Sequence, residues 1–324
     1  RSSDLTTPNG LSGVRAVDTD LDGTVDHVYA GDLQGNLYRF DLSSSNTASW
    51  GSSTKLLFQA TYGVGGAAQP ITNKPVVIKH PEETGFIVIF GTGSWITDED
   101  ATSTDIQSIY GVCDDMSNTP LVTRLSTNAQ LVEQSFEDQS ALKEGNTVGS
   151  LSSNTVTYDN TGSASSKVMG WYIDLDVEDE GGTVQYPGER AVRDFLVRGG
   201  LLFVNTVLPK DPTSCGPVPG GFTLGFDPVS GSASSDAIFD LNGDGQFSLT
   251  DNIADVDSPD NVVSRIRHDS GTPSDSSFID NILVTNVSTG NSNGGTTTGD
   301  VDSIRTNTGG GSGTGRFSWR ELKP

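Results

Sequence analysis

The sequence predicts an all-β protein, organised as a β-propeller with long inserted loops. Short runs of β-branched and aromatic residues recur along the 324-residue chain, separated by turns rich in Gly, Ser, Asn and Asp. Hydrophobic residues make up only 33% of the chain, which suits many short strands better than packed helices. Most runs are followed by a second run across a glycine-containing turn, and recurring hairpins of this kind are typical of propeller blades.

Four blade-like units follow one another along the chain. The predicted strand pairs are residues 25–42, turning at 33–36; residues 85–96 with 107–112; residues 194–207, turning at 198–200, followed by 221–227; and residues 280–287 with 315–321. The helical alternative is poor, because only residues 126–142 have a pattern compatible with a short helix.

Residues 1–324 are interpreted as a single propeller-type domain. Three polar stretches, 43–53, 118–149 and 290–315, predict surface loops, and the last reads as a flexible insertion between two strands of one terminal sheet. Four units are fewer than most closed propellers need, so we expect the C-terminal part of a larger propeller. The chain does not open on a secretory signal and is expected to be processed or partial.

Residues 18–26, DTDLDGTVD, predict a calcium-binding loop. Oxygen-bearing residues stand at positions 1, 3, 5, 7 and 9, from which such loops supply their ligands, and Gly23 at position 6 permits the sharp turn. The expected ligands are Asp18, Asp20, Asp22, the backbone carbonyl of Thr24, and Asp26. Four carboxylates this close together repel one another strongly unless a cation lies between them. The alternative is a solvated turn, since Asp, Asn and Gly also dominate turns that hold no metal.

Residues 240–251, DLNGDGQFSLTD, predict a second calcium loop, because they match the twelve-residue pattern with Asp in place of the usual Glu at position 12. The expected ligands are Asp240, Asn242, Asp244, the backbone carbonyl of Gln246, Ser248 through a water molecule, and Asp251. Position 12 of the first loop is Tyr29, which weakens the expected affinity there. Neither loop has flanking amphipathic helices, so both are interpreted as calcium-binding loops embedded in a β-protein rather than as EF-hand domains.

Charge and cysteine content limit the partners. A net charge of −23 argues against nucleic acid, because phosphate binding needs clustered Lys and Arg. No apolar run approaches the roughly 18 residues that a membrane-spanning helix needs. Cys113 and Cys215 lie far apart in the sequence; they either form a disulfide in an oxidising compartment or remain separate thiols.

A series of segments, in a fixed order, carries a family resemblance. The first calcium loop runs into VYAGDLQGNLYRFDL, and the later segments are QPIT at 69–72, IVIFGTGSWIT at 87–97, GWYIDL at 170–175, GERAVRDFLVRGG at 188–200 and GRFSWREL at 315–322. In these segments, which cover most of the chain, the sequence resembles the C-terminal propeller domain of the PilC/PilY family of type IV pilus tip-associated proteins.

The resemblance implies a calcium-binding protein that supports pilus biogenesis, controls pilus retraction and helps cells adhere to surfaces, with consequences for twitching motility and virulence. It places the family's calcium ligands on Asp18, Asp20, Asp22, Thr24 and Asp26. It also implies export to the bacterial cell surface, the outer membrane or the pilus tip. The partners it implies are minor pilins or the pilus tip complex, host or abiotic surfaces, and the missing N-terminal part of the propeller.

Two other functions are weighed against this one. The strands also resemble quinoprotein propellers, so the fold is expected to be a quinoprotein-like propeller, complete or partial; but the vicinal Cys pair of quinone dehydrogenases is absent, and no Ser or Cys is matched with a His for nucleophilic catalysis. We therefore expect that the protein is not an enzyme. The second alternative is a calcium-dependent carbohydrate-binding module that stacks sugars on Trp50, Trp95, Trp171 or Trp319, although each is more often a strand or core aromatic.

Overall fold

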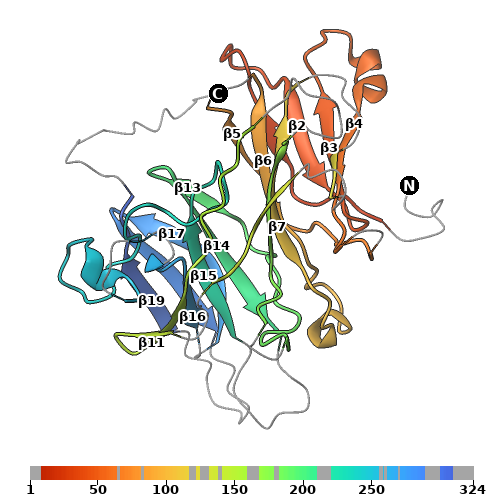
Figure 1. Ribbon diagram of the computed structural model, residues 1–324. Helices are drawn as coiled ribbons and strands as arrows, with labels where there is room; N and C mark the ends of the chain where they lie inside the picture. Colours follow the sequence, from red (N-terminus) through yellow and green to blue (C-terminus); the bar gives the residue numbers. More distant parts are fainter. Residues whose placement is uncertain are drawn as a thin grey trace.

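The computed structural model has the predicted all-β architecture, with four sheets in a β-propeller arrangement (Figure 1). It describes residues 9–63, 66–81, 84–116, 122–124, 131–137, 141–158, 168–178, 182–209, 220–254, 258, 261–268, 271–288 and 300–308. Short 3₁₀ helices lie in the connections: η2 (Thr47–Ser53), η3 (Asp100–Thr102) and η4 (Leu249–Asp251). Within these described ranges, no helix has the length and apolar character that crossing a membrane requires.

The first two sheets are antiparallel meanders with one additional strand at an edge. The first sheet has the order β1 (Arg15–Val17), β2 (His27–Gly31), β3 (Asn36–Asp41), β4 (Lys55–Gln59) and β8 (Val122–Thr123). The second sheet has the order β5 (Val76–Lys79), β6 (Phe86–Gly91), β7 (Ser108–Asp114), β12 (Gly170–Asp174) and β9 (Val132–Gln134). In each sheet the additional strand, β8 or β9, runs parallel to its neighbour.

The third and fourth sheets continue the pattern. The third has the order β10 (Ala141–Lys143), β11 (Asn146–Gly149), β16 (Arg265–His268), β15 (Gly220–Phe226), β14 (Leu201–Leu208) and β13 (Leu196–Arg198). The fourth has the order β17 (Thr272–Ile279), β18 (Ile282–Ser288) and β19 (Asp300–Arg305). Strands β8 to β11 lie within residues 118–149, so the prediction of a plain surface loop there is wrong.

The first three predicted strand pairs are confirmed. Strands β2 and β3 pair antiparallel across a turn that ends at Gly35, where φ is 78°. Strand β6 pairs with β7. Strands β13 and β14 meet at Gly199 and Gly200, with φ of 60° and 81°, and β15 follows on the far edge of β14. Glycine adopts these positive φ values without the steric cost that a Cβ adds, which is why the turns could be located from the sequence.

The fourth predicted pair is wrong. Strands β17 and β19 occupy both edges of β18, so β18 cannot pair with residues 315–321, which lie outside the described residues. Strand β19 also corrects the interpretation of 290–315 as a flexible insertion, because residues 300–305 are paired with β18. The helix predicted within 126–142 is wrong over its described part, where β9 and the beginning of β10 lie.

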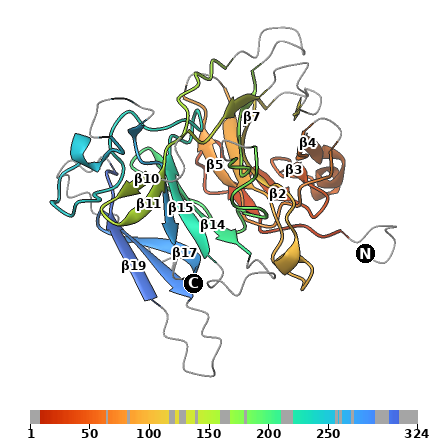
Figure 2. The same cartoon turned by 60° about the horizontal axis from the view of Figure 1, so that its bottom comes forward.

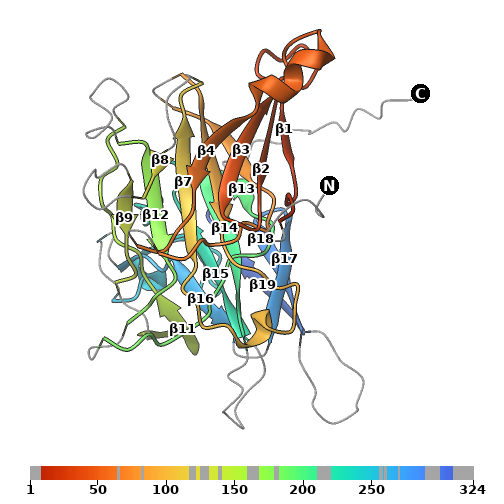
Figure 3. The same cartoon turned by 90° about the vertical axis from the view of Figure 1, so that its right-hand side faces the viewer.

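The sheets stack on one another in sequence order, because alternate side chains of the central strands face opposite neighbours. On β6, Ile89 belongs to an apolar cluster shared with the third sheet, whereas Phe90 belongs to one shared with the first sheet. On β14, Leu202 faces the second sheet, and Phe203 belongs to a cluster that includes Leu283 of the fourth sheet. Figure 2 shows the resulting succession, with the first and fourth sheets on opposite sides of the molecule, and in Figure 3 the first sheet lies in front of the others.

Arginine side chains tie successive sheets together near their first strands. The Nε of Arg15, on β1, donates a hydrogen bond of 3.0 Å to the carbonyl of Pro75, which immediately precedes β5. The Nε of Arg193 donates one of 3.2 Å to the carbonyl of Pro273, on β17. Each bond fixes a strand of one sheet against the chain that enters another.

Buried ion pairs add to these contacts. Arg39 of the first sheet and Asp114 of the second are 2.6 Å apart, and the hydroxyl of Tyr29 donates to the same carboxylate at 2.8 Å. Arg265 of the third sheet forms an ion pair with Glu189, and the two residues are 1% and 0% exposed. Because both partners of each pair are buried, losing one of them leaves an uncompensated charge in the interior.

Candidate calcium-binding loops

The first predicted loop, residues 18–26, connects β1 to β2 and is closed at its base by the sheet. Val17 pairs with His27 in the β1–β2 register, and the backbone N–H of Asp26 donates to the carbonyl of Val17 at 3.0 Å. Inside the loop, the Asp18 carboxylate accepts hydrogen bonds from the backbone N–H groups of Leu21 at 2.7 Å and Gly23 at 2.8 Å. The backbone of the loop is therefore folded around the Asp18 carboxylate.

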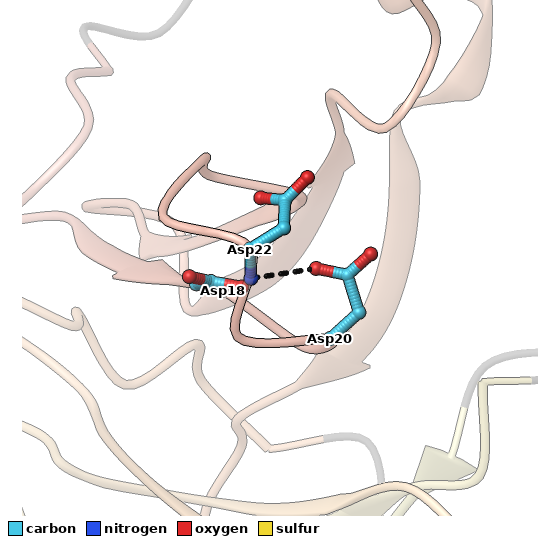
Figure 4. Close-up of side chains that lie close together, drawn as sticks. All are labelled: Asp18, Asp20 and Asp22. Atoms are coloured by element: carbon cyan, nitrogen blue, oxygen red, sulfur yellow. Dashed lines mark hydrogen bonds between the residues drawn. The ribbon is translucent and has the colours of Figure 1, made fainter.

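Three carboxylates converge at this turn. Asp18, Asp20 and Asp22 each offer an oxygen, and these oxygens lie within 4.8 Å of one another (Figure 4). The dashed line in Figure 4 marks the bond from the Asp22 N–H to the Asp20 carboxylate, which is 3.1 Å long. Across the described residues, no Lys or Arg forms an ion pair with these three side chains. A hard divalent cation suits this set of oxygens, because it needs several oxygen ligands and neutralises their charge.

The other two predicted ligands, Thr24 and Asp26, form hydrogen bonds within the loop. The Asp26 carboxylate accepts hydrogen bonds from the N–H and the hydroxyl of Thr19, and these bonds lower the pKa of Asp26, the hydroxyl contributing most. Asp26 is 9% exposed and is not a member of the converging group. Thr24 donates from its backbone N–H to the Asp22 carboxylate at 2.7 Å.

The second predicted loop, residues 240–251, is wound in the same manner. The Asp240 carboxylate accepts from the N–H of Gly245 at 3.0 Å, Asn242 accepts from the N–H of Asp244 at 2.9 Å, and Asp244 accepts from the N–H of Gln246 at 2.8 Å. Unlike the first loop, it does not bring three carboxylates together, since within the described residues only the first loop does so.

Asp251 closes the second loop. One of its carboxylate oxygens accepts from the N–H of Leu241 at 2.9 Å, and the other accepts from the N–H of Ser248 at 3.0 Å. With Ser248 it forms the capping box of η4, a role that its place in the calcium-loop pattern did not reveal. The signal was nevertheless present, because Ser followed three residues later by an acidic residue is a helix-start pattern.

A Thr–His–Asp arrangement that the sequence reasoning missed lines a cavity of about 440 Å³ between the third and fourth sheets. The Nε2 of His268 lies 2.7 Å from the hydroxyl of Thr223, and its Nδ1 lies 2.8 Å from the carboxylate of Asp302. Thr223, however, donates its own hydroxyl proton to the side-chain oxygen of Asn205 at 2.7 Å. His268 therefore does not receive that proton, and Thr223 is not arranged as an activated nucleophile.

The same arrangement predicts an acid-dependent contribution to stability. The hydrogen bond from His268 holds the pKa of Asp302 below its ordinary value of 3.8. A carboxyl group with a lowered pKa in the folded state stabilises fully above the pKa of the unfolded chain, and this stabilisation is lost as pH falls through the folded pKa. We expect Asp302→Asn to be less stable than the wild type at pH 6, with the difference shrinking as pH falls below about 4.

Urea unfolding of both proteins from pH 6 to pH 3 measures this difference. The control is Asp280→Asn, which alters an exposed carboxylate at another point of the fourth-sheet hairpin. A constant difference between wild type and Asp302→Asn over the whole range would rule out the His268 contact as its source.

The tryptophans give little support to a sugar platform. Trp171 is fully buried, and the ring N–H of Trp50 donates to the carbonyl of Ser44 at 2.8 Å. Trp95 is 39% exposed, with the guanidinium of Arg190 at 5.4 Å from its ring centre. Trp319 lies outside the described residues, as does Cys215, so the predicted alternatives for the two cysteines remain open. Cys113 is buried on β7.

Comparison with known proteins points to one family. Residues 3–146 match the family described as the PilY1 beta-propeller domain. The type IV pilus biogenesis factor PilY1 of Pseudomonas aeruginosa strain PAO1 is 34% identical over 259 residues, which is 72% of this chain and 22% of that protein. A PilY1 homolog of Xylella fastidiosa is 30% identical over 317 residues, covering 98% of this chain and 22% of that protein.

The fold has a counterpart among solved structures. The crystal structure of the Pseudomonas aeruginosa PilY1 C-terminal domain matches with a TM-score of 0.71 at 29% identity, covering 94% of this chain and 62% of that one. This chain thus spans about a fifth of the length of the full relatives. The names of these relatives describe pilus biogenesis factors, which is not an enzymatic role.

Proposed function

Because this chain belongs to the PilY1 β-propeller family, we propose that it is part of a type IV pilus biogenesis factor whose first loop, residues 18–26, binds Ca²⁺. In this proposal, the protein acts outside the cell, at the cell surface or the pilus tip. There it supports pilus assembly, controls retraction and contributes to adhesion, with minor pilins or the pilus tip complex as its partners. The relatives' names support the pilus role, and the loop geometry supports the calcium role.

The convergence of Asp18, Asp20 and Asp22 is the observation that carries the calcium proposal. Three ionised carboxylates within 4.8 Å, with no ion pair to a described Lys or Arg, destabilise the folded loop. A bound Ca²⁺ removes this repulsion, and in our proposal the carbonyl of Thr24 and the Asp26 carboxylate complete its oxygen ligands.

Calcium binding here is expected to order the first sheet. The loop closes the β1–β2 hairpin, and Tyr29 of β2 reaches the buried Asp114 of the second sheet through its hydroxyl. A ligand that binds the folded state alone stabilises that state by mass action, by about 2.7 kcal/mol at a hundredfold excess over its dissociation constant. The surface-exposed protein would therefore change its stability with the calcium level around it.

The double variant Asp20→Asn/Asp22→Asn tests this proposal. Both side chains are exposed, and Asn keeps an oxygen that can accept the local backbone hydrogen bonds, so we expect the apo protein to fold normally. Calorimetric titration of the double variant with CaCl₂ should show that the binding event assigned to residues 18–26 is lost. The rise in melting temperature on adding calcium should shrink accordingly, while melting temperatures in EDTA stay close to the wild-type value.

Asp98→Asn is the matched control, because it removes an exposed carboxylate from another loop and should leave calcium binding unchanged. In cells that depend on the full-length protein for pili, the double variant should reduce surface piliation and twitching, and Asp98→Asn should not. Undiminished calcium binding in the double variant would refute the site. If the double variant loses calcium binding but cells that carry it have normal piliation, the link between the site and the pilus is refuted.

A further inference from the structure

We propose that residues 240–251 form a second calcium site, which fastens the fourth sheet to the third. The proposal rests on contacts of the second loop itself and stands independently of the first loop. Two observations carry it. A buried carboxylate oxygen of the loop has no hydrogen-bond partner among the described residues, and the loop is attached both to β19 of the fourth sheet and to the segment that leads into β16 of the third.

The Asp240 carboxylate is the unusual group. Its side chain is 3% exposed, and within the described residues its Oδ1 has no hydrogen-bond partner. Its Oδ2 accepts from the N–H of Gly245, so the carboxylate is turned toward the inside of its own loop. Burying a carboxylate oxygen without a partner is costly, and such groups are normally paired or bound to a metal ion.

Among the described residues, Arg305 is the cationic side chain paired with this carboxylate, and it does not satisfy the Oδ1 atom. The Nε of Arg305 lies 3.6 Å from Oδ2 of Asp240, which is beyond hydrogen-bond distance, and the Arg305 side chain is 50% exposed. A half-exposed ion pair of this length contributes little, because solvent screens it. Arg305 would also repel a cation in the loop, so it is expected to weaken calcium binding rather than to replace it.

The other ligands follow from the winding of the loop. Asn242 and Asp244 each use a side-chain oxygen to accept a backbone N–H two residues later, which places their oxygens along the inside of the turn. With the carbonyl of Gln246, they supply further oxygens of the kind that calcium prefers. Both oxygens of Asp251 already accept backbone hydrogen bonds, so we assign Asp251 a positioning role at the closure of the loop instead of the bidentate ligation of an EF-hand.

This ligand set indicates a weak site. Asp240 and Asp244 bring two carboxylates, whereas the first loop brings three together, and affinity rises with the number of charged ligands. The expected dissociation constant is on the order of 10⁻⁴ to 10⁻³ M, the range of extracellular calcium modules.

The loop joins two sheets. At its beginning, Phe239 pairs with Thr306, and the N–H of Asp240 donates to the carbonyl of Arg305 at 3.0 Å, at the end of β19. After its end, the N–H of Ile253 donates to the carbonyl of Asn261 at 2.8 Å, shortly before the chain enters β16 of the third sheet. Figure 1 shows this segment, in cyan, beside β19. A bound ion would hold both attachments in register.

The test uses a protein whose first loop is already disabled. Calorimetric titration of the Asp20→Asn/Asp22→Asn variant with CaCl₂ should leave one weak binding event. Adding Asp244→Asn, an exposed substitution, should weaken that event at least tenfold, and adding Asp236→Asn, an exposed carboxylate just before the loop, should not. If the double variant binds no calcium, the second site is wrong while the first-loop proposal stands.

Arg305→Gln separates a metal site from a merely structural loop. Removing the competing positive charge should tighten calcium binding several-fold, whereas a loop stabilised by the Asp240–Arg305 pair would only lose stability. Hydrogen exchange gives a second readout. Calcium should slow exchange of amides in residues 238–254 and 300–306 of the first-loop variant, and an unchanged pattern there would overturn the proposal.

Discussion

Replacing Arg265 with Met is expected to lower the free energy of unfolding by about 3–5 kcal/mol. Arg265 and Glu189 are buried together, and the hydroxyl of Thr206 donates to the other Glu189 oxygen at 2.6 Å. The Arg265 guanidinium also lies 3.5 Å from the ring centre of Phe222. Met fills much of the volume but leaves the Glu189 carboxylate without its counter-charge in the interior, which is strongly destabilising.

The cost of Arg265→Met should depend on pH. Burial raises the pKa of Glu189 above its ordinary value of 4.5, and Arg265 opposes this rise. Without Arg265 the rise is larger, and a group with a raised pKa in the folded state loses its stability contribution as pH increases through that pKa. The deficit of the variant should therefore be smallest below about pH 4.5 and grow toward neutral pH.

Urea unfolding of wild type and Arg265→Met at pH 4 and pH 7, in saturating calcium, measures both effects. The double variant Glu189→Gln/Arg265→Met removes both charges and should recover a large part of the loss. A double variant no more stable than Arg265→Met would show that packing of the arginine, and not its charge, accounts for the result.

Replacing Trp171 with Ala is the second change with a large expected effect, a loss of about 3–5 kcal/mol. The ring is fully buried between the second and third sheets, and its N–H donates to the carbonyl of Pro228 at 3.2 Å. A Cβ added to Gly111 or Gly231 would lie 2.3 or 2.4 Å from the ring, so the backbone lies against the ring at two places. Surroundings built so closely around one side chain cannot collapse to fill the cavity that Ala leaves.

Trp50→Ala is the matched control for Trp171→Ala. Trp50 is only partly buried in η2, where its ring N–H donates to the nearby carbonyl of Ser44, so its loss should cost much less than that of Trp171, on the order of 1 kcal/mol. Chemical denaturation of the two variants compares them directly. A similar cost for both would mean that the interface between the second and third sheets depends little on Trp171.

The sequence was sufficient where local chemistry decides the structure. The turn ending at Gly35 and the hairpin at Gly199–Gly200 need positive φ, and glycine marks such positions directly. The continuous apolar runs of β6 and β14 are typical of strands covered on both faces. The Asp18–Asp20–Asp22 spacing likewise predicts convergence, because the loop that brings these carboxylates together is only a few residues long.

Long-range contacts and polar strands escaped the same reasoning. Strand β17 contains a proline and several serines, and its pairing with β18 is irregular between Pro273 and Ser276. Strand β19 lies in a stretch whose composition predicts a loop, and its pairing with β18 makes it a strand. The His268–Asp302 contact joins residues 34 positions apart, and Asp302 lies on β19. No local sequence pattern predicts this contact, because it depends on how the sheets pack.

The linear succession of sheets has a consequence for how this domain comes apart. The second and third sheets each take part in two apolar clusters, whereas the first and fourth each take part in one. In arrays whose units contact mainly their neighbours, the outermost units open first and at the lowest free energy. The two loops that we propose as calcium sites lie at the first and fourth sheets. Within the part of the chain that the structure describes, calcium depletion would then loosen the first and fourth sheets while the second and third stay folded, which is a graded loosening rather than an all-or-none collapse.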